Sequence, residues 1–323
     1  MNRIELFKGD CLTIMDELIA KGIVVDAIIC DPPYQTTACS WDTLIPFNKH
    51  IMVEKGKKLI PMYQDEWILQ ELKKSNNNIH QCMEEFNELA KEGMWCKLNK
   101  LIKPNGAIVL FGSEPFSSAL RMSNIKNYKE DVVWLKNKSA SGMQAKQKHL
   151  KVHENIMVFA NETKYIFNPQ KWLVQDKEFL TQRKTLKEFE CGNTVYASAT
   201  RVRKKDDGTR NPISIVTCAV PITPAKTKTY ANHIDINFHS TQKPIELMEY
   251  LIKTYTNENE IILDFTMGSG STGVASKNLN RGFIGIELND YFEIAEKRIE
   301  EAVLGSSLEV PLEMKVYKLS KYS

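Results

Sequence analysis

The sequence has no run of apolar residues long enough to cross a lipid bilayer, although 42% of its 323 residues are hydrophobic. A membrane-spanning helix needs about 20 consecutive apolar residues, so we expect no membrane partner. The amino-terminal segment MNRIELFKGD also lacks the apolar stretch and the small-residue cleavage site of a secretory signal. These absences predict a cytoplasmic protein.

The cysteines lack the spacing that metal and redox centres need. There are seven of them, an odd number, and no two form a CxxC pair. Zinc sites and redox centres built on cysteine usually contain such pairs. We therefore expect reduced thiols, most of them buried, and no metal site.

The net charge is small, only +3, but the basic residues are unevenly distributed. Between Glu162 and Asn232 there are 13 lysines and arginines against 7 acids, and a group of lysines just upstream contains no acid. Clustered cations indicate contacts with nucleic-acid phosphates, although a solvated basic surface explains the charge pattern equally well. The candidate phosphate contacts are Lys136, Lys138, Lys146, Lys148, Lys151, Arg201, Arg203, Lys204 and Lys205.

Strands alternate with helices at both ends of the chain. The predicted strands are Ile4–Lys8, Val24–Cys30, Ala107–Gly112, Asp131–Leu135, Asn155–Phe159, Glu260–Phe265 and Gly282–Glu287. The predicted helices are Met83–Leu101, Pro115–Ser123, Pro244–Tyr255, one that ends near Leu279 and one that runs through Ile299. Periodicity weakens between Asn161 and Asn232, which indicates an inserted region. This order predicts an α/β fold with a doubly wound, mostly parallel sheet that carries an insertion.

A glycine-rich turn follows the predicted strand Glu260–Phe265 and opens a helix. Residues 268–273 match G-x-G-x-x-G, in which glycines let the backbone approach a bound group closely. Glu287 ends the next strand, 19 residues after Gly268, where a carboxylate accepts hydrogen bonds from ribose hydroxyls. These features indicate a cofactor that contains adenosine, and they fit NAD as well as S-adenosylmethionine. The alternative is a tight turn followed by a surface glutamate.

The tetrapeptide Asp31-Pro32-Pro33-Tyr34 follows an apolar strand, at the carboxyl end where an α/β sheet places its chemistry. The amino nitrogen of adenine is a poor nucleophile because its lone pair is delocalised into the ring. The Asp31 carboxylate and the Pro32 carbonyl are two acceptors that would direct this lone pair toward a methyl donor, and paired prolines fix that carbonyl. Tyr34 offers an aromatic face on which an extruded base stacks. A turn that merely ends the strand is the alternative.

Together, residues 31–34 (Asp-Pro-Pro-Tyr) and 264–270 (Asp-Phe-Thr-Met-Gly-Ser-Gly) resemble motifs IV and I of the amino-methylating DNA methyltransferases, in the order of the β class. His153-Glu154 resembles part of motif VIII of this family. Residues 239–244 resemble motif X, which binds the methionine part of the cofactor. One departure is Thr266, where the family usually has phenylalanine.

The resemblance implies a Rossmann-like, S-adenosylmethionine-dependent methyltransferase fold. Residues 1–160 would form its catalytic half, 161–235 an inserted target-recognition region, 236–303 its cofactor-binding half and 304–323 a carboxyl-terminal tail. The catalytic residues that it implies are Asp31, Pro32, Pro33 and Tyr34. The cofactor-binding residues that it implies are Asp10, Cys11, Asp31, His239, Ser240, Thr241, Gln242, Lys243, Asp264, Thr266, Gly268, Ser269, Gly270, Ser271, Thr272, Glu287 and Leu288.

The activity that the resemblance implies is site-specific methylation of double-stranded DNA at N6 of adenine, by base flipping and direct transfer. N4 of cytosine is the alternative because both amines need the same two acceptors. Family members often work beside a cognate restriction enzyme and some form homodimers, so both are candidate partners.

Three other interpretations use only part of the sequence. An NAD dehydrogenase explains the glycine turn and Glu287 but leaves the Asp-Pro-Pro-Tyr segment unused. A protein or ribosomal RNA methylase shares the cofactor half, but the similar glutamine-methylating proteins have Asn in place of Asp31. A DNA-binding module without catalysis stays open, although every residue that the chemistry needs is present.

Overall fold

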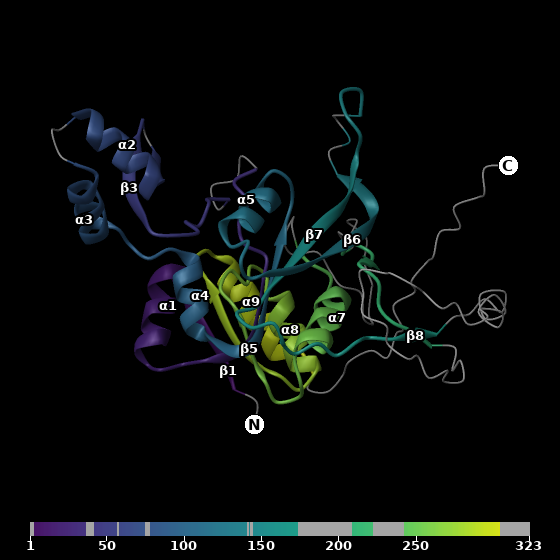
Figure 1. The fold of residues 1–323 in the computed structure, drawn as a ribbon. Helices are drawn as coiled ribbons and strands as arrows, with labels where there is room; N and C mark the ends of the chain where they lie inside the picture. Colours follow the sequence, from purple (N-terminus) through teal and green to yellow (C-terminus); the bar gives the residue numbers. More distant parts are fainter. Residues whose placement is uncertain are drawn as a thin grey trace, which may run out of the picture.

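The computed structural model describes residues 3–36, 42–56, 58–74, 78–140, 142, 145–173, 209–221 and 242–303 (Figure 1). Within these residues, eight strands form a central sheet in the order β1-β12-β11-β2-β5-β7-β6-β10. β7 is antiparallel to β5 and β6, and every other pair in this sheet is parallel. The strands are β1 (Ile4–Lys8), β2 (Val25–Cys30), β5 (Ile102–Gly112), β6 (Tyr128–Ala140), β7 (Lys151–Phe159), β10 (Ile215–Thr217), β11 (Ile261–Asp264) and β12 (Gly282–Glu287). The predicted mostly parallel sheet is confirmed.

Helices cover both faces of this sheet. β2 is buried along its whole length, since Ala27 and Ile29 pack on one side while Ile28 and Cys30 pack on the other. The first side is covered by α7 (Ile245–Tyr255), α8 (Ser271–Asn278) and α9 (Tyr291–Glu301). The second side is covered by α1 (Cys11–Ala20), α4 (Met94–Leu101) and α5 (Phe116–Ser123). The predicted doubly wound α/β fold is therefore confirmed.

The predicted helix Met83–Leu101 is wrong, because the chain forms two helices there, α3 (Ile79–Leu89) and α4. Gly93 separates them, and it lies so close to Asn48 that a Cβ atom on it would be 2.2 Å from the Asn48 carbonyl oxygen. α3 packs against α2, and the two helices stand out from the body with a β-hairpin (Figure 1). The other elements of this unit are α2 (Gln64–Lys74), β3 (His50–Lys55) and β4 (Lys58–Tyr63).

β6 and β7 are longer than their predicted apolar cores and continue as a hairpin that projects from the body in Figure 1. The projecting residues are mostly polar, so no apolar alternation marks them as strands. Of the predicted insertion, residues 161–235, the structure describes 161–173 and 209–221. This part contributes β8 (Trp172–Leu173), β9 (Thr209–Arg210) and the edge strand β10 of the central sheet.

Two kinds of feature are absent from the part of the chain that the structure describes. No helix there combines the length and the apolar content that a membrane span requires. Nor does any group of His, Cys, Asp or Glu side chains in that part have an arrangement suited to a metal ion.

Candidate active site

The two main sequence motifs meet at the carboxyl ends of adjacent strands. β2 ends at Cys30 and pairs with β11, which ends at Asp264. Ligands of open α/β sheets bind in the crevice at such a point, where the connections of neighbouring strands diverge. A cavity of about 340 Å³ lies here and is lined by residues of both motifs. Its volume is that of a small-molecule site.

The Asp31 carboxylate lies in the wall of this cavity, with a hydrogen-bond donor at each oxygen. The hydroxyl of Tyr34 donates to Oδ1, and the ammonium of Lys243 donates to Oδ2. Burial raises the pKa of Asp31, while Lys243 and Tyr34 oppose that rise. Because Lys243 lies directly before α7, this contact joins the two distant parts of the chain that carry the motifs.

Glu154, on β7, is a second carboxylate in the same cavity wall. Its Oε2 lies 3.3 Å from the Lys243 ammonium, and its Oε1 accepts a hydrogen bond from Lys136. Burial would raise the pKa of Glu154, but the two ammonium groups outweigh burial and lower it. Burial likewise opposes the charge of Lys243, and the carboxylates of Asp31 and Glu154 outweigh it and raise the Lys243 pKa. The result is a row of alternating charges.

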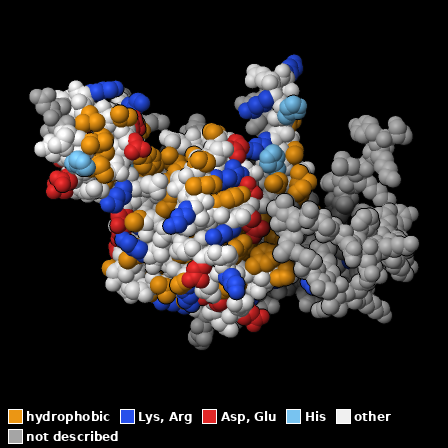
Figure 2. All heavy atoms as spheres, viewed as in Figure 1, with side chains coloured by type: hydrophobic (Ala, Val, Ile, Leu, Met, Phe, Trp, Pro, Cys, Tyr) orange, Lys and Arg blue, Asp and Glu red, His pale blue; other side chains and the backbone are white. Residues whose placement is uncertain are grey.

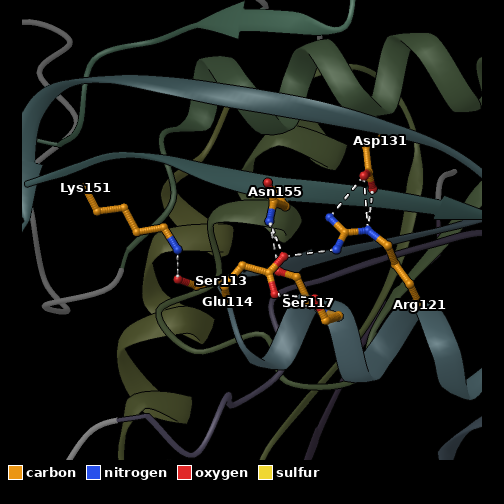
Figure 3. Close-up of polar contacts among 8 residues, drawn as sticks. Ser113, Glu114, Ser117, Arg121, Asp131, Lys151 and Asn155 are labelled. Atoms are coloured by element: carbon orange, nitrogen blue, oxygen red, sulfur yellow. Dashed lines mark hydrogen bonds and ion pairs between the residues drawn. The ribbon is translucent and has the colours of Figure 1, made fainter. Parts of the chain in front are cut away.

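Lys136 belongs to this row and not to the exposed surface. Its side chain is 15% exposed, and its ammonium lies 4.7 Å from the centre of the Trp134 ring. Lys136 was predicted to contact a DNA phosphate, but its ammonium is turned into this row and not toward the surface, where such a contact would lie. Lys151 is half-buried, and its ammonium donates a hydrogen bond to the Ser113 hydroxyl (Figure 3).

The ring of Tyr34 is held by Phe116, the first residue of α5. The two ring centroids are 4.9 Å apart, and the ring planes are inclined by 28°. Stacking of aromatic rings favours a defined orientation, so Phe116 fixes the plane of the Tyr34 ring and covers one of its faces. The sequence pattern did not single out Phe116.

Helix α5 is itself tied to the sheet by polar contacts (Figure 3). The Arg121 guanidinium contacts Glu114 at 3.1 Å and Asp131 of β6 at 3.0 Å. The Asn155 amide of β7 donates to the Ser117 hydroxyl at 3.1 Å and to Glu114 at 3.4 Å. These contacts hold Phe116 in place against Tyr34.

The turn after the Asp-Pro-Pro-Tyr segment depends on a residue that the sequence pattern did not indicate. Gln35 has a left-handed backbone conformation, with φ of 56°. The buried carboxylate of Asp42 accepts hydrogen bonds from the backbone N–H groups of Gln35 (2.7 Å) and Thr36 (2.8 Å). Asp42 therefore stabilises the turn that sets the direction of Tyr34.

The glycine-rich loop opens α8 and lines the cavity. Gly268 and Gly270 have positive φ values, 52° and 81°, which glycine adopts at little cost. Gly273 has a different role, since a Cβ atom on it would lie 2.4 Å from Ile299 of α9. Thr266, the departure from the family pattern, donates its hydroxyl to the Asp31 backbone carbonyl at 3.1 Å. It thereby links this loop to the catalytic segment.

Two buried acids flank the loop. Glu287 accepts hydrogen bonds from the backbone N–H groups of Gly268 and Asn289, both at 2.9 Å. Asp264 accepts one from the Thr272 hydroxyl at 2.6 Å. Burial raises the pKa of Asp264 to about 6, although the Thr272 hydroxyl opposes the rise.

Most of the predicted cofactor residues line this cavity. Asp10 does so while it caps α1 through the backbone N–H of Thr13. Gly270 is not part of the lining, and residues 239–241 lie outside the described residues. The predicted residues that line it are Asp10, Cys11, Asp31, Gln242, Lys243, Asp264, Thr266, Gly268, Ser269, Ser271, Thr272, Glu287 and Leu288.

The family of the chain follows from its similarity to known proteins. A family model for DNA methylases of the N6/N4 type matches residues 25–297. The chain belongs to this DNA methylase family. The methylase is 24% identical over 311 residues to the type II methyltransferase M.HinfI of Haemophilus influenzae, a match that covers 92% of this chain and 68% of that protein. It is 51% identical over 63 residues to M2.DpnII of Streptococcus pneumoniae, which covers 19% of this chain and 24% of that protein.

Solved structures show the same fold for the methylase. The M1.HpyAVI–SAM complex superposes with a TM-score of 0.50 at 23% identity and covers 92% of this chain and 98% of that one. The cytosine-N4-specific PvuII DNA methyltransferase superposes with a TM-score of 0.50 at 14% identity and covers 92% and 86%. The predicted Rossmann-like methyltransferase fold is thus confirmed.

S-adenosylmethionine is the cofactor of this family, and the cavity of the methylase fits it. The carboxylates of Asp31 and Asp264 in its wall would suit the positive charge of the cofactor, and Glu287 would be the carboxylate that accepts hydrogen bonds from its ribose hydroxyls. The Ser271 hydroxyl, at the amino end of α8, is buried and has no hydrogen-bond partner among the described residues. A polar group of this kind at a helix amino terminus suits the carboxylate of the cofactor.

Proposed function

We propose that this methylase transfers a methyl group from S-adenosylmethionine to the N6 amine of a flipped-out adenine in double-stranded DNA. The position of Asp31 supports this most directly. Its carboxylate lines the cofactor cavity beside the Tyr34 hydroxyl, at the carboxyl end of a strand that neighbours the cofactor loop. The reaction needs a hydrogen-bond acceptor for the amine and an aromatic platform for its base at such a place.

In this proposal the chain itself prepares the amine. S-adenosylmethionine supplies an electrophilic methyl group on a positively charged sulfur. The Asp31 carboxylate and the Pro32 carbonyl accept hydrogen bonds from the two N–H groups of the amine and direct the nitrogen lone pair toward the cofactor side of the cavity. The negative charge of Asp31 also stabilises the positive charge that develops on the nitrogen. Tyr34, held by Phe116, stacks with the extruded base.

The β6–β7 hairpin is the DNA contact that we propose within the described residues. Figure 2 shows basic side chains along this projection, and Lys138, Lys146 and Lys148 are exposed there. Lys151 lies at its base, beside Ser113. Cations on a projecting element contact phosphates without reading base sequence. Arg201, Arg203, Lys204 and Lys205 lie outside the described residues and stay predicted contacts.

N4 of cytosine is the second candidate target. It needs the same two acceptors at Asp31 and Pro32, so the geometry of the acceptors suits either amine. Aspartate in the first position of the tetrapeptide favours adenine by resemblance to the adenine enzymes. We therefore retain adenine as the proposed substrate and cytosine as the alternative.

The other proposals concern organisation and partners. Residues 161–235 would hold the target-recognition region between the catalytic and cofactor-binding halves, with residues 304–323 as a tail. Because M.HinfI and M2.DpnII are named as type II methyltransferases, we propose a cognate restriction enzyme as partner. A homodimer and a cytoplasmic location stay predictions.

A direct test identifies the methylated nucleoside. The purified chain is incubated with unmethylated genomic DNA and S-adenosylmethionine that carries a labelled methyl group, and the DNA is then digested to nucleosides. Label in N6-methyldeoxyadenosine is the expected result, and label in N4-methyldeoxycytidine would favour the second candidate. Absence of label from all DNA nucleosides, when RNA or protein supplied in a parallel incubation is labelled, would contradict DNA methylation. The Asp31→Ala variant is the matched control.

A further inference from the structure

Both oxygens of the Asp31 carboxylate already have donors, so an incoming amine meets a conflict. Tyr34 occupies Oδ1 and Lys243 occupies Oδ2. If Asp31 is the acceptor for the target amine, as proposed above, the amine competes with these two donors, and release of one of them would leave an oxygen of the carboxylate free for the amine. Tyr34 is restrained by its stacking on Phe116. Lys243 has a long stem with several rotatable bonds and three N–H donors, so of the two donors it is the one that can change its acceptor.

A second acceptor for Lys243 lies within reach. Glu154 Oε2 is 3.3 Å from the Lys243 ammonium, longer than a strong ion-pair hydrogen bond. The Lys243 ammonium lies 5.1 Å from the centre of the Phe111 ring, on the sheet face where β7 presents Glu154. A small movement of the ammonium would therefore exchange the Asp31 contact for a full contact with Glu154.

The neighbours of Glu154 suit it to this exchange. Its side chain is 15% exposed, and Lys243 and Lys136 together outweigh burial, lower its pKa and keep it in the ionised form that a cation needs. The next residue, Asn155, points to the opposite face of the strand and is fixed by Ser117 and Glu114 of the α5 region (Figure 3). Glu154 is thus ionised, lies close to Lys243 and belongs to a strand that is anchored at the next residue. If Lys243 left Asp31 and had no second carboxylate nearby, its buried charge would be unpaired, and that state would be strongly disfavoured.

We propose that Glu154 is a positioning residue that takes Lys243 from Asp31 when the target amine enters, and so frees the Asp31 carboxylate for that amine. Glu154 would not touch the substrate itself. This inference rests on the proposed role of Asp31.

The test is a double-mutant cycle on single-turnover methyl transfer, with labelled S-adenosylmethionine bound to the enzyme and excess unmethylated genomic DNA. In Glu154→Gln, Lys243 should stay on Asp31, so we expect the transfer rate constant to fall by about tenfold while affinities for S-adenosylhomocysteine and DNA are retained. In the Lys243→Met background, the same Glu154→Gln change should have no further effect, because no cation is left to move.

Two further variants guard against a merely structural effect. Glu154→Asp keeps the charge and should restore most of the rate that Glu154→Gln loses. Asp16→Asn removes the carboxylate partner of another buried lysine, Lys97. Neither residue lines the cavity, so this variant should lower thermal stability without changing the transfer rate.

An unchanged rate in Glu154→Gln, or a loss of equal size in the parent and in Lys243→Met, would overturn the inference. If Glu154→Gln does not fold, Glu154→Ala takes its place in the cycle, and it must likewise slow transfer in the parent but not in the Lys243→Met background. Failure of the proposed function has a different signature, since Asp31→Asn would then retain transfer. An inactive Asp31→Asn with a fully active Glu154→Gln would overturn only the role of Glu154.

Discussion

The ammonium of Lys243 contacts the carboxylate of Asp31, although 212 residues separate them in the chain. The contact requires that β2 lies next to β11 in the sheet and that α7 packs on one face of that sheet. An ion pair in the cavity wall therefore joins the Asp-Pro-Pro-Tyr segment to the part of the chain that carries the glycine-rich loop, and the role proposed for each can be tested separately.

Asp31→Ala should abolish methyl transfer and leave cofactor binding within a few-fold of the parent. The cofactor loop is built around Gly268 and Glu287, which hydrogen-bond to each other, and Lys243 retains Glu154 as a partner. Calorimetry with S-adenosylhomocysteine and single-turnover transfer measure the two effects. A variant that still transfers at nearly the parent rate would remove Asp31 from the chemistry.

Glu287→Ala should weaken cofactor binding by about 1–3 kcal/mol, the cost of losing hydrogen bonds to a charged group. In the parent, the Glu287 carboxylate accepts the N–H groups of Gly268 and Asn289, so the loss includes some loosening of the loop. Calorimetry with S-adenosylhomocysteine gives the affinity. Unchanged affinity, or tight binding of NAD, would count against the cofactor site.

The local part of the site could be predicted from sequence. Asp31 and Gly268 each follow an apolar strand, and that pattern is visible within a few residues, so both motifs and their order were recognisable. Phe116, Asp42 and the Lys243 contact depend on which strands and helices become neighbours. No spacing in the sequence encodes those contacts, because they join elements that are distant along the chain.

Several strands of the sheet were predicted better than the helices around them. Residues 4–8 and 282–287 form strands with the predicted bounds, because turn signals lie at the ends of these apolar segments. α1 was missed even though Asp10 is a good helix cap and Ile14, Met15 and Leu18 share a buried face. The break at Gly93 comes from a close approach to Asn48, which is a tertiary contact.

Cofactor selectivity should depend on pH through Asp264. Because burial raises its pKa to about 6, the carboxylate is ionised at neutral pH and becomes protonated in mild acid. S-adenosylmethionine carries a sulfonium charge that S-adenosylhomocysteine lacks, and an ionised Asp264 favours that charge. Affinity for S-adenosylmethionine relative to S-adenosylhomocysteine should thus fall between about pH 7.5 and about pH 5.5.

Calorimetry with both ligands at several pH values measures this ratio, and Asp264→Asn should remove its pH dependence in that window. The same pKa also predicts how the stability of the cofactor-free protein changes with pH. Since the folded pKa lies above the ordinary 3.8, the contribution of Asp264 to stability falls as pH rises through about 6. A selectivity ratio that is flat with pH in the parent would contradict the role of this acid.

Replacing Lys138, Lys146 and Lys148 with glutamine should weaken binding to all DNA sequences. Each phosphate that a lysine neutralises releases counterions, so the slope of log K against log salt should become shallower by about 1 for each phosphate that is no longer neutralised. The methylated sequence should stay the same, because phosphate contacts position the protein without reading bases. Filter binding at several salt concentrations, with modification mapping, separates these effects.

The matched control replaces Lys21, Lys100 and Lys297, which are exposed on or directly after helices away from the hairpin. It changes the net charge by the same amount and should change the salt dependence little. If the two triple variants behave alike, the hairpin lysines are a solvated surface and the DNA contacts lie elsewhere.

The central claim, transfer to N6 of adenine in DNA, is tested most directly by sequencing host DNA with detection of modified bases. A host that expresses the parent gene is compared with hosts that carry the empty vector or the Asp31→Ala variant. We predict N6-methyladenine at one recurrent sequence with the parent gene only. Modified cytosine at that sequence, or the same adenine modification with the Asp31→Ala variant, would contradict the account.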